Sequence, residues 1–141
     1  MNVRKLALYA GALLLALPMM ASAAGPRAGK WQITMEMDMP GMPMKMPPQT
    51  FTQCISKEQA ANPQEALPKA TRDKNSDCKL QDYKVDGNKV SWKFDCPKEK
   101  MTGNGAATYE SDSYTATMSM SMPDHEMTMK YSGKRVGDCE Q

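Results

Sequence analysis

The residues with the most distinctive chemistry in this sequence are its methionines. The chain has 15 of them among 141 residues, and most of those beyond residue 30 lie in two short segments. The first contains Met35, Met37, Met39, Met42, Met44 and Met46, and the second contains Met118, Met120, Met122, Met127 and Met129. Most are two residues apart, and this spacing places side chains on the same face of a β-strand. A surface of thioethers can bind a soft metal ion or pack adaptably against an apolar partner.

A soft metal site is the first hypothesis that these residues suggest. Thioether sulfur selects Cu(I) or Ag(I) over harder ions, and imidazole is a further copper ligand. Some of the methionines lie in a proline-rich segment, and others surround the single histidine, His125. The candidate metal ligands are Met42, Met44, Met46, Met122, His125 and Met127. Cu(I) is the one cofactor that the sequence suggests.

The strand methionines suggest a second hypothesis, which is an apolar binding surface. Unbranched, polarisable methionine side chains can repack around varied partners, and aromatic rings beside them would add rigid contacts. The candidate ligand-binding residues are Trp31, Met35, Met37, Trp92, Phe94, Met118, Met120 and Met129. Such a surface would hold a small apolar molecule or an unfolded hydrophobic segment. An ordinary filled core, or a set of methionines that oxidants convert reversibly to sulfoxide, would use the same residues.

The four cysteines predict disulfides rather than a zinc or redox site. There is no C-x-x-C pair, and zinc sites and catalytic redox motifs favour such close pairs. An even number of cysteines in an exported domain is typical of disulfides. Cys78 and Cys96 flank an expected hairpin and would meet if a bulge shifted one strand, which leaves Cys54 to join Cys139. The alternative, Cys54–Cys78 with Cys96–Cys139, stays open because simple up-and-down counting places Cys139 at the opposite end from the other three.

The sequence favours a non-catalytic protein. A nucleophile–base pair needs a base that an acid orients beside a Ser, Thr or Cys. The acidic neighbours of His125 are Asp124 and Glu126, and adjacent strand residues point to opposite faces. The sequence contains no Walker pattern, phosphate-binding glycine loop or zinc signature.

The N-terminal segment predicts export. Residues 1–23 have basic Arg4 and Lys5, an apolar run and a small-residue cleavage pattern, which together are typical of a signal peptide. We expect one mature β domain over residues 24–141, in the periplasm and without a lipid anchor, because no cysteine directly follows the cleavage site. Removal of the two basic residues from the total of 18 leaves 16, against 16 acidic residues, so the mature chain has no basic surplus for nucleic acid. No later segment is long and apolar enough for a transmembrane helix.

Alternation of apolar and polar residues predicts strands as the main elements. In residues 30–39 the odd positions are apolar and the even positions are polar. Residues 40–48 contain four prolines and predict a loop. A short strand is expected over 49–55, and Ser56 and Gln59 then fit a capping box at the start of a short helix.

Turn residues set the register of the later strands. Asp86-Gly87 marks one hairpin. Turns at residues 111–112 and 123–124 would place Met118 opposite Gly105 on one side and opposite Met129 on the other. A further turn, with Asp95 paired to Lys100, would place Phe94 opposite Met101 and Trp92 over Gly103, and an aromatic ring over a strand glycine is a known stabilising arrangement.

These registers agree on one apolar face, so the sequence predicts an all-β fold. We expect a curved antiparallel meander of about seven strands, with one short helix after the second strand. A closed lipocalin-like barrel, a partly open barrel and a one-sided sheet wrapped on the helix all fit this pattern.

A set of local motifs resembles a known family. The motifs are Gly29-Lys30-Trp31, Met39 to Pro43, Gln53-Cys54, Gly87-Asn88 with Trp92 and Cys96, Met101-Thr102-Gly103, and Lys130 to Cys139. Together they resemble, over the whole mature length, a family of small exported bacterial proteins catalogued as a domain of unknown function. The resemblance implies a periplasmic β domain with four cysteines, and it implies no activity, ligand or catalytic residue.

From the residues we therefore expect a non-catalytic periplasmic binding protein. Its expected ligand is a small apolar molecule or a hydrophobic segment, held on the methionine-lined face. Binding of Cu(I) or Ag(I) is one alternative, and a structural or oxidant-sink role is another.

Overall fold

Strands dominate the chain, as the alternation predicts. The computed structural model describes residues 25–43, 45–62, 64 and 77–140. Its strands are β1 (Gly29–Asp38), β2 (Gln49–Ile55), β3 (Lys79–Asp86), β4 (Lys89–Cys96), β5 (Met101–Tyr109), β6 (Ser113–Ser121) and β7 (Glu126–Gly137), and its α-helix is α1 (Lys57–Ala61). The predicted signal peptide lies outside the described residues. Among the described residues, no helix has the length and apolar character needed to cross a membrane.

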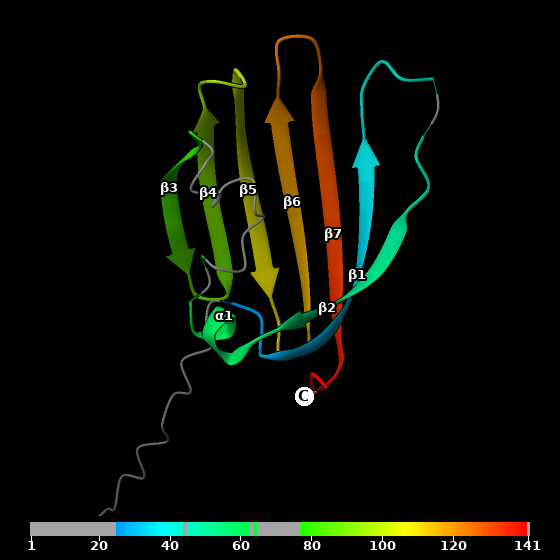
Figure 1. Ribbon diagram of the computed structural model, residues 1–141, viewed down its shortest axis with the longest axis vertical. Coiled ribbons are helices and arrows are strands. Elements are labelled where there is room, and N and C mark those ends of the chain that lie inside the picture. Colours follow the sequence, from blue (N-terminus) through cyan, green and yellow to red (C-terminus); the bar gives the residue numbers. More distant parts are fainter. Residues whose placement is uncertain (1–24, 44, 63, 65–76, 141) are drawn as a thin grey trace, which may run out of the picture.

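All seven strands belong to one open antiparallel sheet, so the predicted fold class is confirmed. The strand order is β2-β1-β7-β6-β5-β4-β3. Figure 1 shows β3 to β7 side by side, with β1 next to β7. The edge strands β2 and β3 follow one another in sequence but do not pair, so the sheet does not close and the closed form is not observed.

The inner strands separate apolar from polar side chains. On β1, Trp31 and Ile33 are buried, whereas Gln32 and Glu36 are exposed. We call the side of the sheet that contains Trp31 and Met118 the apolar face, and the other side the polar face. Because the side-chain period of a strand is two, the hydrogen-bond register places the apolar residues of all strands on the same side.

The two-residue turns set the predicted register. Gly105 lies opposite Met118, and Met118 lies opposite Met129. The first hairpin is also as predicted, because Asp86 pairs with Lys89 across Gly87-Asn88. These three turns therefore set the register within β3–β4 and within β5–β6–β7.

The β4–β5 hairpin differs from the prediction. Phe94 lies opposite Gly103 and Trp92 lies opposite Gly105, so the predicted register was wrong by two residues. The reason is that the turn spans residues 97–100. A shift of two keeps every side chain on its face, so Trp92 still covers a glycine, which is Gly105, and Phe94 covers Gly103 instead of facing Met101.

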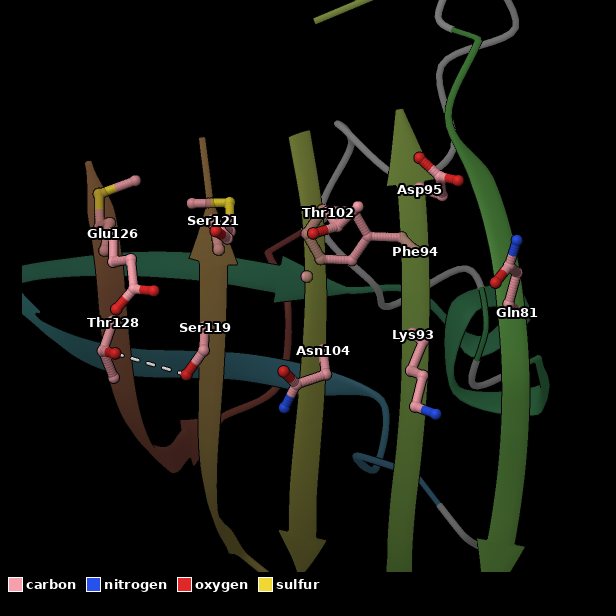
Figure 2. Close-up of a pocket in the computed structure, with 13 residues that line it drawn as sticks. Gln81, Lys93, Phe94, Asp95, Thr102, Asn104, Ser119, Ser121, Glu126 and Thr128 are labelled. Carbon is pink, nitrogen blue, oxygen red and sulfur yellow. Dashed lines mark hydrogen bonds between the residues drawn. The ribbon is translucent and has the colours of Figure 1, made fainter. Parts of the chain in front are cut away.

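The start of β1 and the end of β2 bend over the apolar face. Figure 1 shows both passing in front of the lower ends of the neighbouring strands, and Figure 2, viewed from the polar side, shows them behind. The bend brings Trp31 to 5.6 Å from the ring of Tyr114, measured between centroids. Trp31, Ile33 and Ile55 form a small buried cluster, and Ala60 of α1 packs against it. The predicted capping box holds this helix, since Ser56 and Gln59 exchange hydrogen bonds of 2.9 and 3.1 Å.

Two disulfides tie the sheet, in the first of the two pairings considered above. Cys78–Cys96 joins the edge strand β3 to β4 across 18 residues of sequence, and Cys54–Cys139 joins β2 to the C-terminal segment across 85. A bulge lies at Asp82, which has a φ of 49°. This bulge supplies the one-residue shift that brings Cys78 opposite Cys96.

Candidate functional site

Methionines of three neighbouring strands meet on the apolar face. Met37 of β1 lies opposite Met129 of β7, which lies opposite Met118 of β6. In the next row, Met127 lies opposite Met120. The Cβ atoms of directly opposite residues are about 5 Å apart, so these five side chains form one continuous thioether surface. We call it the methionine surface.

The methionine surface has a buried part and an accessible part. Met118 and Met129 are buried, whereas Met37, Met120 and Met127 are half-buried. The hydroxyl of Tyr131 donates a hydrogen bond of 3.2 Å to the sulfur of Met129. The buried pair therefore contributes to packing, and the other three can contact a bound molecule.

Aromatic rings lie next to the methionine surface. Trp92 and Phe94 are buried in the same hydrophobic cluster as Met118 and Met129, and the candidates Met35, Met37 and Met120 pack against this cluster. Trp31 belongs instead to the second cluster, where its Nε1 donates to the carbonyl of Arg27 at 2.8 Å. Seven of the eight candidate ligand residues are thus brought together, and Trp31 is apart from them.

Two polar atoms in this apolar region are buried without a hydrogen-bond partner among the residues that the structure describes. They are Nε1 of Trp92 and the hydroxyl oxygen of Tyr83. Gln81 pairs with Lys93 and Lys84 pairs with Ser91, so the bulge of β3 places Tyr83 close to Trp92 across the strand pair. Burial raises the pKa of Tyr83. Sequence reasoning missed Tyr83 as a site residue, although counting back from the Asp86-Gly87 turn gives its position beside Trp92.

The candidate metal ligands fall into two separate places. Met122 donates its backbone N–H to the carbonyl of His125 at 2.9 Å across the β6–β7 turn, and Met127 follows in β7. Met42 and Met46 lie on the connection between β1 and β2 and are 60% and 40% exposed, and Met44 lies outside the described residues. The pairing of Asp38 with Thr128 places the start of this connection beside the first residues of β7, at the same end of the sheet as the β6–β7 turn.

One further soft donor lies next to the β6–β7 turn. Thr102 pairs with Ser121, so Met101, one residue before Thr102, is beside Met122, one residue after Ser121. Both side chains are half-buried. The sequence signal for Met101 was present, but the β4–β5 register that was expected placed it opposite Phe94.

The polar face has a hollow of about 480 Å³ across β3 to β7. Figure 2 shows the polar side chains that line it. They form two rows across the strands. One row contains Asp95, Thr102, Ser121 and Glu126, and the other contains Lys93, Asn104, Ser119 and Thr128, with Gln81 at the edge. The hydroxyls of Ser119 and Thr128 are hydrogen-bonded at 3.4 Å, and Lys93 forms an ion pair of 3.0 Å with Asp82. Sequence reasoning missed this hollow, because alternation marks these positions only as solvent-facing.

The carboxylates of the hollow do not form a catalytic pair. Asp95 is on β4 and Glu126 is on β7, with β5 and β6 between them. At a strand spacing of about 4.8 Å their backbones are about 14 Å apart, whereas paired glycosidase carboxylates are about 5 to 9.5 Å apart. The hollow therefore lacks the carboxylate spacing of a glycosidase.

Comparison with known proteins identifies a family without a described activity. A family model described as "Protein of unknown function (DUF3617)" matches residues 26–139. Neither the curated proteins nor the solved structures gave a match. The match extends from the segment before β1 to the cysteine that anchors the C-terminal segment.

Proposed function

Since this chain belongs to the family of proteins of unknown function DUF3617, which has no described activity, we propose from its geometry that the protein is a non-catalytic binding protein. Its ligand is a small apolar molecule with one hydrogen-bond acceptor. The ligand contacts the methionine surface and takes a hydrogen bond from Trp92 or Tyr83. We further propose, as the sequence suggests, that the protein acts in the periplasm, since its two disulfides are typical of an oxidising compartment.

The observation that supports this proposal is the pair of unpartnered donors. Within the described part of the chain, Nε1 of Trp92 and the hydroxyl of Tyr83 are buried without a hydrogen bond. A buried donor that lacks an acceptor costs about 1–3 kcal/mol, and such groups are uncommon in native proteins. A ligand carbonyl or carboxylate would satisfy either donor and remove this cost.

The neighbouring side chains define the apolar part of the ligand. Trp92 and Phe94 supply rigid rings, and Met37, Met120 and Met127 are half-buried and unbranched. Methionine adapts to ligands of different shapes, because its three rotatable bonds let the thioether repack. This composition favours an alkyl chain or a ring system over a sugar or a nucleotide.

The test compares the two tryptophans of the chain. A naphthalenesulfonate dye that fluoresces in apolar surroundings reports binding. A twelve-carbon fatty acid and the twelve-carbon primary alcohol compete with it. Trp92→Phe keeps a buried ring but removes the donor, so the fatty acid should bind about fivefold more weakly, since a net hydrogen bond contributes about 1 kcal/mol. Trp31→Phe is the matched control, because its Nε1 already donates to Arg27, and it should leave the affinity within twofold.

Two outcomes would contradict the proposal. One is the absence of saturable dye binding to the folded wild-type protein. The other is an unchanged fatty-acid affinity in Trp92→Phe, which would show that the unpartnered indole nitrogen has no part in binding. Thermal unfolding of both variants ensures that affinities are compared below the unfolding transition.

A further inference from the structure

We propose that the tip of the β6–β7 hairpin, together with the first residue of β5, binds one Cu(I) or Ag(I) ion. The donors are the sulfurs of Met101, Met122 and Met127 and the imidazole of His125. We call these four residues the tip cluster. The tip cluster shares Met127 with the methionine surface, but its ion binding does not depend on the proposed apolar-ligand function.

Strand register brings the tip cluster together on one face. Met101 is beside Met122, because the preceding pair in the ladder is Thr102 with Ser121. Met122 is opposite His125, because its N–H donates to the His125 carbonyl at 2.9 Å. One row therefore contains Met101 at the start of β5, and Met122 and His125 on the two sides of the β6–β7 turn.

Met127 adds a donor from the next row. It pairs with Met120, which is two residues before Met122 and so lies on the same face. Neighbouring strands are about 4.8 Å apart, and same-face residues of one strand are about 6–7 Å apart. The long methionine side chains span such separations, so their sulfurs and the imidazole can converge on one ion.

The chemistry of the donors determines the class of ion. Neutral thioethers bind soft ions, and an imidazole completes a sulfur–nitrogen site for copper. All four cysteines are in disulfides, so no thiolate competes for the ion. Calcium, magnesium and manganese prefer carboxylate and carbonyl oxygen, which these four side chains lack.

Exposure distinguishes the tip cluster from the buried methionines Met118 and Met129. Met101, Met122 and Met127 are half-buried and His125 is exposed, so an ion can reach them from solvent. Met118 is buried, and the sulfur of Met129 accepts a hydrogen bond from Tyr131. The buried residues are therefore controls for a general effect of methionine content.

The experiment is an anaerobic Cu(I) titration of the mature chain against a chromophoric Cu(I) chelator, with a parallel Ag(I) titration. We expect one ion per chain. Met122→Leu and Met101→Leu should each weaken binding at least tenfold, and His125→Asn should also weaken it. Met118→Leu should change the affinity less than twofold. Leucine conserves volume, so these variants should remain folded, and circular dichroism checks this.

Carbon-13 labelling of the methionine methyl groups gives a second readout. Silver binding should shift the methyl resonances of Met101, Met122 and Met127, and leave that of Met118 unchanged. The proposal is overturned if no stoichiometric binding occurs, or if Met122→Leu binds as the wild type does. It is also overturned if binding is lost in Met42→Leu or Met46→Leu instead, which would place the ion on the β1–β2 connection.

Discussion

At the scale of single residues, two glycines of β5 allow the aromatic rings to lie flat against the sheet. Phe94 covers Gly103, and Trp92 covers Gly105. A Cβ atom on Gly105 would collide with the indole ring of Trp92. Glycine in a strand usually weakens the strand, but it is suited to a place where another group approaches the backbone closely.

This arrangement predicts the effect of one added methyl group. Gly105→Ala should lower the free energy of unfolding by about 1–3 kcal/mol, because the Trp92 ring must move from its packed position. The control is Ala106→Val, which adds methyl groups at the next residue of β5, on the exposed polar face, and should stay within about 0.5 kcal/mol of the wild type. Urea unfolding measures both. An equal effect of the two variants would mean that ring packing does not require the glycine.

Residue identity predicted the type of these contacts but not their positions. That an aromatic ring covers a β5 glycine follows from the alternation and from the number of small residues in β5. Which glycine pairs with which ring depends on the turn at 97–100, whose residues contain no glycine or asparagine to indicate a turn type. Lys100 adopts a φ of 50° there, a conformation that non-glycine residues seldom adopt, so the sequence did not predict it.

At the scale of the elements, hairpins with short turns were predicted in full. The β5–β6 and β6–β7 registers follow from two-residue turns, and they align four of the five residues of the methionine surface and the Tyr109–Tyr114 pair. A turn of the same kind places two candidate metal ligands, Met122 and His125, opposite each other. The position of Met101 beside them depends on the unpredicted turn, which is why sequence reasoning did not include it.

The tyrosine pair of β5 and β6 predicts a loss of stability at alkaline pH. Burial raises the pKa of Tyr109 and of Tyr114 to about 12, with a smaller contribution from the neighbouring tyrosines. In the unfolded chain both would ionise near pH 10. The contribution of these two tyrosines to the free energy of unfolding is therefore fully present below about pH 10. It is lost as the pH rises toward 12, by up to about 1.4 kcal/mol per pH unit for each tyrosine.

Urea unfolding between pH 8 and pH 12 measures this effect, and phenolate absorbance reports the ionisation. Tyr109→Phe should unfold with a shallower pH dependence above pH 10, because one of the two linked protons is absent. The lysines are the same in both proteins, so their deprotonation cancels in the comparison. Identical slopes for the variant and the wild type would rule out Tyr109 as a source of the alkaline loss.

At the scale of the whole molecule, strand order could not be predicted from local pattern. Alternation and turns describe each hairpin, but the pairing of β1 with β7 joins distant segments without a turn. This pairing places Cys139 near Cys54, because Lys30 of β1 lies opposite both Cys54 and Gly137. The sequence left two cysteine pairings open for this reason. It also could not place Trp31, which the bend of β1 moves into a separate cluster from Trp92.

The long-range pairing predicts that the two disulfides contribute unequally to stability. Cys54–Cys139 spans 85 residues and Cys78–Cys96 spans 18, so loop-closure entropy gives about 4.6 and about 3.2 kcal/mol, respectively. Replacement of Cys54 and Cys139 by alanine should therefore lower the free energy of unfolding by about 1.4 kcal/mol more than removal of the other bridge. In that second variant Cys78 becomes alanine and Cys96 becomes valine, because Cys96 is fully buried and valine limits the cavity. Urea unfolding under oxidising conditions ranks the two variants. A larger loss of unfolding free energy on removal of the shorter loop would show that local packing at Cys96, rather than chain entropy, determines the contribution of these bridges.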